Sequence, residues 1–158
     1  MDIRFVLIGG VVGCFVVGSL AGGFVEQAAA ALPQAVREKV FQRESRGLLL
    51  LRLMDIAGIL MFLLGMLWLF GVVSGGPAFV YRFMLVAAGF VLMCLERTLA
   101  FGLQYRAHAA EAGTETSRGK ALAAFLLVAV LELALAGGVC GWLFTHPHFK
   151  SDWAKQFG

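Results

Sequence analysis

The sequence is poor in charged residues, and this excludes an ordinary soluble domain. Only 15% of its 158 residues are Asp, Glu, Lys or Arg, whereas 60% are hydrophobic. Soluble domains carry about 25% charged residues. The net charge of +3 is small, and no basic patch is interleaved with aromatic residues. The charge is therefore typical of membrane orientation rather than of a nucleic-acid surface, and we expect no nucleic-acid partner.

Cysteine is scarce as well, and the three cysteines are far apart along the chain. Cys14, Cys94 and Cys140 each lie inside an apolar run, with neither CxxC spacing nor a histidine nearby. Metal and redox motifs place their ligands at such fixed spacings. We therefore interpret the cysteines as small packing residues and predict no metal site.

Histidine is equally rare, and none of the three histidines lies inside a predicted membrane span. This argues against an internal haem held by two histidines. His146-Pro147-His148, with Asp152 nearby, has no third ligand at a fixed spacing, so we interpret these residues as a solvated tail. No glycine-rich loop spells a phosphate-binding motif. The sequence predicts no cofactor and no catalytic residue.

Long apolar runs are what the chain has instead. They cover about residues 5–25, 47–73, 79–105 and 121–144. About 20 apolar residues in a helix cross a hydrocarbon core of about 30 Å. We predict an all-α integral membrane protein, a single domain over residues 1–158 with four transmembrane helices in an antiparallel up-down bundle. The segment Val11 to Cys14 loosely matches a lipoprotein cleavage box, but the apolar run continues well past it, so we expect the first helix to be retained.

The segments between the runs predict a hairpin and an orientation. Ser74-Gly75-Gly76-Pro77 breaks the helix, so the second and third helices form an antiparallel pair. Residues 26–46 are polar, yet Pro33 and the helical spacing of the apolar residues after it indicate that the second helix begins outside the bilayer. The two longer loops hold more Lys and Arg than the opposite side. This predicts cytoplasmic loops and both termini outside, and we expect a bacterial inner membrane.

The first helix carries a ridge of small residues at intervals of four: Gly10, Cys14, Gly18 and Gly22. In lipid, small residues let two helix backbones approach closely, and the resulting dispersion contacts hold the helices together. The ridge is therefore a predicted helix-packing interface. It fits an interface with another subunit and packing within this bundle equally well.

Five ionisable residues interrupt the apolar runs: Arg52, Asp55, Glu96, Arg97 and Glu132. A charge at the centre of a membrane helix costs about 2.5–3.5 kcal/mol, so these side chains should face one another or a wet cavity. We predict an intramembrane charge network in which Arg97 pairs with Asp55 and Arg52 pairs with Glu96. Glu132, near the midplane, is then the acid in excess. The network is either a structural lock or a proton or cation site.

Two resemblances to known families are limited. The stretch from Gly22 through the polar loop to Ala57 resembles the proteolipid hairpin of rotary ATP synthases, but the connection is longer and Arg52 accompanies the acid. The length, the four spans, and Arg97 followed by Tyr105 are similar to the membrane-bound glutathione-dependent enzymes of eicosanoid metabolism. That resemblance implies a polar pocket near Arg52 and Arg97, although the family's Glu-Arg and Asn signature before the second helix is missing.

Three functions follow, in order of preference. The first is a non-catalytic accessory or assembly subunit of a larger membrane complex, which packs through its glycine-rich first helix against lipid and other subunits or a second copy. The alternative is a small proton-linked transporter or ion-path subunit that uses intramembrane carboxylates. The third is a membrane-embedded enzyme of the glutathione-dependent type. A transport site needs a hydrated route to Glu132, whereas a structural lock should be dry and fully paired.

Overall fold

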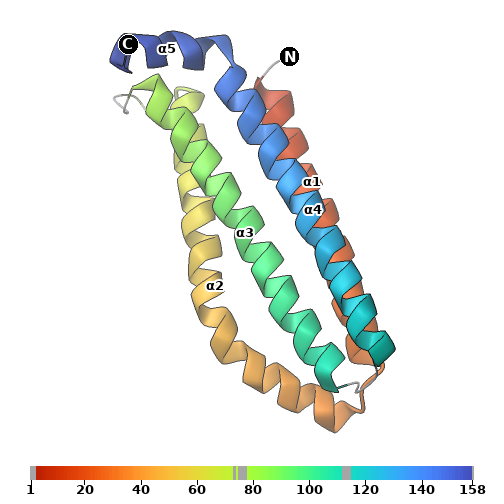
Figure 1. Cartoon of the computed structure of the whole chain (residues 1–158). Coiled ribbons are helices and arrows are strands. Elements are labelled where there is room, and N and C mark those ends of the chain that lie inside the picture. The colour runs from red at the N-terminus through yellow and green to blue at the C-terminus, as the bar shows by residue number, and fades with distance from the viewer. Residues whose placement is uncertain (1–2, 73, 75–77, 112–114, 158) are drawn as a thin grey trace.

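The predicted bundle of long helices is confirmed. The computed structural model describes residues 3–72, 74, 78–111 and 115–157. They form five helices: α1 (Ile3–Ala30), α2 (Gln34–Leu69), α3 (Phe79–Glu111), α4 (Glu115–Thr145) and α5 (Pro147–Phe157). The first four run antiparallel, and the N-terminus lies at the same end as α5 (Figure 1). Each of the four is long and apolar enough to cross a membrane: Phe5–Ala30, Leu48–Leu69, Phe79–His108 and Gly119–Thr145.

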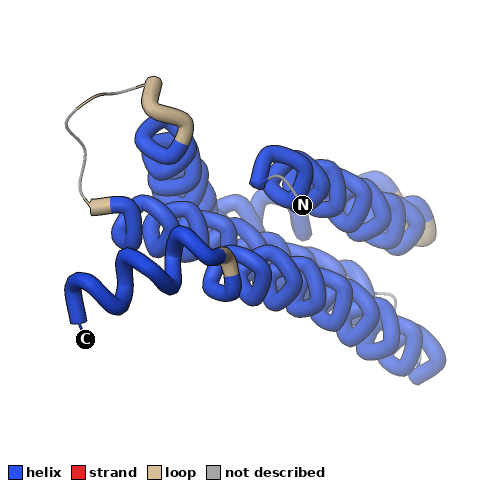
Figure 2. The backbone as a smooth tube through the Cα atoms, turned by 90° about the horizontal axis from the view of Figure 1, so that it is seen from above, coloured by secondary structure: helices blue, strands red, loops and turns tan. Residues whose placement is uncertain are grey.

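Helix α3 is the centre of the bundle. It packs against α2 on one side and against α4 and α1 on the other, and α1 also packs against α4. In the described chain, α1 and α2 share no comparable interface, and the view from above shows α1, which begins at N, apart from α2 (Figure 2). Accordingly, 50% of the most apolar stretch of α3 is buried, against 22–28% in the other three helices.

The closest helix contact joins α2 to α3 through glycines. A Cβ atom at Gly89 would lie 2.5 Å from the backbone nitrogen of Phe62 and 2.7 Å from the carbonyl oxygen of Gly58. A Cβ at Gly65 would lie 3.0 Å from the backbone nitrogen of Val86. At these positions only glycine lets the two backbones approach so closely, which is how helices gain dispersion energy in lipid. Sequence reasoning placed the small-residue contact on the first helix and missed this one.

The ridge on α1 divides into two halves. A Cβ at Gly10 would lie 2.8 Å from Val139 and 3.3 Å from Phe90, and Cys14 is fully buried. A Cβ at Gly22 would meet nothing within 4 Å, and one at Gly18 would meet only Arg97, at 3.9 Å. The first half therefore packs inside this bundle. An interface with another subunit at the second half stays a prediction.

Helix α2 begins outside the apolar span and enters it without a break, as expected. Pro33 is its N-cap residue, and its apolar span starts at Leu48. The helix ends at Leu69, earlier than the predicted limit of 73, because Gly71 adopts a left-handed conformation with φ of 70°. A positive φ is free of steric cost only for glycine. Of the predicted turn 74–77, only Ser74 lies within the described residues.

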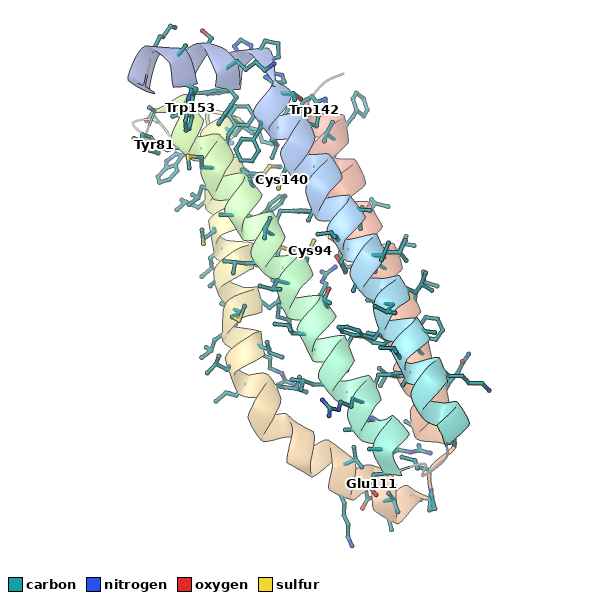
Figure 3. The ribbon with its side chains drawn as sticks, in the orientation of Figure 1. Tyr81, Cys94, Glu111, Cys140, Trp142 and Trp153 are labelled. Carbon is teal, nitrogen blue, oxygen red and sulfur yellow. The ribbon has the colours of Figure 1, made fainter. Side chains whose placement is uncertain are left out.

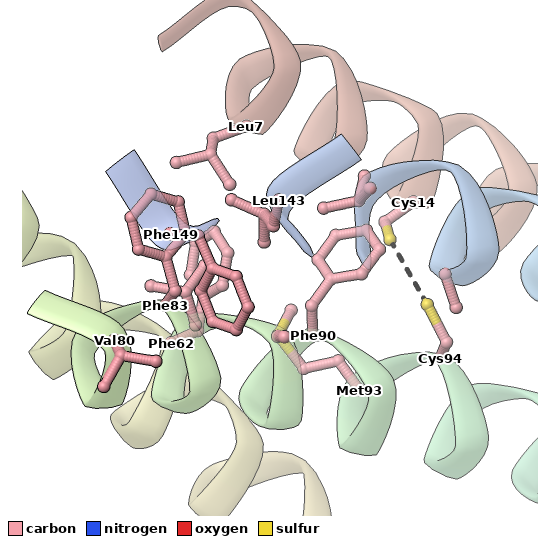
Figure 4. Packing of buried hydrophobic residues seen from close by; sticks show 14 residues of the cluster. Leu7, Cys14, Phe62, Val80, Phe83, Phe90, Met93, Cys94, Leu143 and Phe149 are labelled. Atoms are coloured by element: carbon pink, nitrogen blue, oxygen red, sulfur yellow. Dashed lines mark hydrogen bonds between the residues drawn. The ribbon is translucent and has the colours of Figure 1, made fainter. Parts of the chain in front are cut away.

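The apolar core fills the end of the bundle near the N-terminus. Its fully buried members include Leu7 of α1, Phe83 and Phe90 of α3, and Leu143 of α4 (Figure 4). The tail after α4, for which no helix was expected, forms α5 and lies across this end (Figure 1). Its Phe149 is buried and packs edge-on against Phe83 at 5.8 Å between ring centroids. The tail thereby closes the core from above.

Candidate intramembrane site

Glu132 is the deepest acid in the bundle. It lies in the middle of the α4 span, and only 2% of its surface is exposed. Neither of its carboxylate oxygens makes a hydrogen bond of good geometry in the described structure, and the neighbouring group that interacts with the carboxylate is the thiol of Cys94. Burying a polar group without a partner is costly, and burying an ionised carboxylate costs much more. The position therefore requires a proton or another cation on Glu132.

Two thiols from two other helices meet Glu132. Cys14 of α1 and Cys94 of α3 are 1% and 4% exposed, and their sulfur atoms lie 4.0 Å apart (Figure 4). One oxygen of Glu132 and the two sulfur atoms all lie within 4.8 Å of one another. Cys94 sits about halfway along α3 (Figure 3). Three helices thus bring three ionisable groups together near the middle of the bundle.

Arg97 supplies the only positive charge that acts on this cluster among the described residues. It follows Cys94 by nearly one turn of α3, and its guanidinium interacts electrostatically with both Cys14 and Glu132. Its Nη1 atom is buried and has no hydrogen-bond partner. A basic side chain with an unsatisfied buried donor is costly on its own. Arg97 therefore acts on the cluster through space, whereas the thiols of Cys14 and Cys94 share a hydrogen bond.

A cavity of about 410 Å³ lies between α1 and α3 beside the cluster. Cys14 and Arg97 are both in its wall, together with the polar side chains of Ser19, Glu96 and Gln104. The widely spaced second half of the α1 ridge, at Gly18 and Gly22, leaves this space open. Polar groups that line an intramembrane space provide hydrogen-bond partners for water or for a polar ligand.

The predicted pairs of opposite charges are not formed among the described side chains. The buried Nη1 of Arg97 and the buried Oδ1 of Asp55 both lack a hydrogen-bond partner, so these two atoms do not bond to each other. Arg52 is exposed. Glu96 is half-buried and lies close enough to Asp55, Arg97 and Glu132 to feel their charges. Whether the five charges work as one network stays a prediction.

The structure adds Cys14 and Cys94 to the candidate site, although the sequence pattern indicated that they were packing residues. Cys14 and Cys94 are 80 positions apart, and no local motif connects them. The one available signal was their position: Cys14 lies on the small-residue ridge, and Cys94 lies in the same helix as Glu96 and Arg97. Cys140 is half-buried and donates a weak hydrogen bond to the carbonyl oxygen of Ala87 at 3.9 Å, away from the cluster.

The histidines of the tail lie at the opposite end of the α4 helix from its polar start. The rings of His146 and His148 stack at 5.3 Å, and His146 also packs on Phe83 at 5.8 Å and on Trp142 at 5.0 Å. The side chain of Asp152 is outside the described residues. Burial among these rings, followed by the nearby charge of His148, lowers the pKa of His146.

Comparison with protein families, with curated proteins and with solved structures found no match for this chain. Neither resemblance considered above gains support from it. The function must therefore be argued from the site.

Proposed function

We propose that the protein is a small proton-linked transporter or ion-path subunit. In this proposal, the carboxylate of Glu132 binds and releases a proton or another cation that crosses the membrane. The observation that supports this most directly is that Glu132 is buried in the middle of its span, and that neither carboxylate oxygen makes a hydrogen bond of good geometry or an ion pair. A structural lock stabilises a bundle only when its buried charges are paired, because an unpaired buried charge is strongly destabilising. Intramembrane acids that face the protein interior are typical of proton relays and ion paths.

The cavity between α1 and α3 supports this reading. It reaches Cys14, which neighbours Glu132, and its wall carries Glu96, Arg97 and Gln104. A proton passes between groups that hydrogen-bond directly or through one water molecule. Glu96 is the natural next acceptor, since it lines the cavity and lies within electrostatic range of Glu132.

Proton flux in liposomes tests the proposal. The purified protein is reconstituted with a pH-sensitive dye inside, and a potassium diffusion potential drives the flux. We expect Glu132→Gln to reduce proton uptake to the level of empty liposomes, because the amide cannot release a proton. Glu111→Gln, at the exposed end of α3, is the matched control and should leave uptake unchanged. Unchanged flux in Glu132→Gln removes Glu132 from the mechanism.

An accessory subunit is the second candidate, and one observation favours it. Asp55 of α2 is only partly buried, its Oδ1 has no hydrogen-bond partner, and α2 packs extensively only against α3. Lipid tails offer no hydrogen bonds, whereas a transmembrane helix of another subunit can. Cross-linking followed by mild detergent extraction should then recover a larger complex, and Asp55→Asn should weaken it. A monodisperse monomer without partners speaks against this candidate.

A further inference from the structure

We propose that Cys14, Cys94 and Glu132 bind a thiophilic divalent metal ion of the zinc class. Two thiols and a carboxylate from α1, α3 and α4 converge with their ligand atoms within 4.8 Å of one another. Thiolate and carboxylate are both ordinary ligands of Zn²⁺. The independent sign of a ligand is Glu132 itself, which is 2% exposed and makes no hydrogen bond of good geometry with either oxygen.

The distance between the sulfur atoms fits this ion. In a tetrahedral site with Zn–S bonds of about 2.3 Å, two thiolate sulfurs lie roughly 3.8 Å apart. The sulfur atoms of Cys14 and Cys94 lie 4.0 Å apart. The observed spacing is therefore close to the one that a tetrahedral site requires. Three protein ligands leave a fourth position free, as in zinc sites that exchange their ligand.

The charge balance selects a divalent ion over a monovalent one. Two thiolates and one carboxylate carry a formal charge of −3, and Arg97 beside them carries +1. Counting only the three ligands and Arg97, a divalent ion brings the sum to zero, whereas Cu⁺ leaves −1. Net charge is expensive in the middle of a membrane, so the neutral combination is favoured. Arg97 thus fits as a charge-balancing neighbour rather than as a ligand.

The metal ion binds in exchange for protons. The ion displaces the protons of two thiols and one carboxylic acid, forms two metal–sulfur bonds and one metal–oxygen bond, and releases three protons without any change of redox state. The inference deepens the proposed function, on which its physiological meaning rests, by naming the cation that exchanges with protons at Glu132. Metal binding itself requires no transport and can be measured alone.

The test is a metal titration of the full chain in detergent, without oxygen and with a phosphine reductant. Cd²⁺ and Co²⁺ are the probes, because thiolate ligands produce charge-transfer absorption with both ions. We expect one ion per chain, with the absorption lost in Cys14→Ser and in Cys94→Ser. Cys140→Ser is the matched control, since this third cysteine lies away from the cluster, and should bind as the parent does. Glu132→Gln should keep the sulfur absorption with an affinity at least about tenfold lower.

Circular dichroism of each variant checks that it is folded. The helical content should not change, because serine and cysteine are similar in size. Absence of the absorption in the parent protein overturns the inference, as does binding that survives Cys94→Ser or a Cys14–Cys94 disulfide in the anaerobic protein. If no metal binds while Glu132→Gln still abolishes proton flux, this inference fails and the proposed function stands. If metal binds but proton flux does not depend on Glu132, this inference stands and the proposed function fails.

Discussion

The two sides of α3 are built in opposite ways. Towards α2 the interface is closed, and the glycines at 58, 65 and 89 bring the backbones into contact. Towards α1 the half of the interface near Gly22 is open: a Cβ atom there would meet nothing within 4 Å, and a cavity with polar and apolar side chains in its wall lies between the helices. Since dispersion contacts are the main attraction between helices in lipid, the closed interface is expected to be the stable one. The bundle thus combines a closely packed hairpin with a looser seam that has polar side chains in its wall.

The largest effect is expected at the closed interface. Gly89→Ala places a methyl group 2.5 Å from the backbone nitrogen of Phe62, and a backbone cannot yield as a flexible side chain does. Overpacking should lower the free energy of unfolding by about 3 kcal/mol, measured by denaturation in SDS followed by circular dichroism. Gly22→Ala is the matched control in the open seam and should be neutral or stabilising by up to about 1 kcal/mol. Equal effects at both sites would remove the contrast between the two interfaces.

The next effect concerns the unpaired acid. Glu132→Met keeps the volume and removes two buried oxygens without partners. We expect it to raise the free energy of unfolding by about 1–3 kcal/mol in the absence of metal, because an unsatisfied buried group carries a desolvation penalty of this size. The same denaturation assay measures it. A loss of stability instead would mean that Glu132 is a paired structural residue, which would also undermine the proposed function.

A double-mutant cycle tests whether charged residues on the open side of α3 interact. We expect Arg97→Met and Glu132→Met to be coupled by about 1 kcal/mol, since the two charges act on each other across the cluster. Arg52→Met with Glu132→Met is the control and should be additive, because Arg52 is exposed on α2. Coupling of Arg97 to Asp55 that exceeded its coupling to Glu132 would restore the pairing first predicted from the sequence.

The smallest effect is expected at the α5 end of the closed hairpin and depends on pH. The pKa of His146 is lowered from 6.5, so the undocked tail binds a proton more readily than the docked one. Docking is therefore complete above pH 6.5 and weakens as the pH falls through the lowered value. The protection factors of the amides in 147–155, which correct hydrogen exchange for its intrinsic pH dependence, should fall by up to about tenfold at acidic pH. His146→Phe should abolish this loss of protection, and its persistence there would assign the effect to another group.

The helical spans, and the position of charged residues along them, could be predicted from the sequence. The spans, the hairpin of the second and third helices, and the start of α2 outside its span followed from apolar runs and from Pro33. Glu132 could be identified because it is the single acidic residue in its apolar run, and this is visible in the local sequence alone. Helix α5 was not expected, since its short sequence is polar and becomes a helix by packing Phe149 on the core. Short helices are marginal without such tertiary contacts.

What the sequence by itself determined is that this chain has four helices long and apolar enough to cross a membrane, because hydrocarbon admits only long apolar helices whose backbone bonds are internal. Which faces of those helices meet was decided by the tertiary structure. Small-residue spacing marked α1 as a close contact, yet the closest approach is between α2 and α3 at Gly89. Cys14 and Cys94, 80 positions apart, become neighbours of Glu132 only when three helices are rotated and aligned together. Packing sets these rotations, and packing depends on all the helices at once.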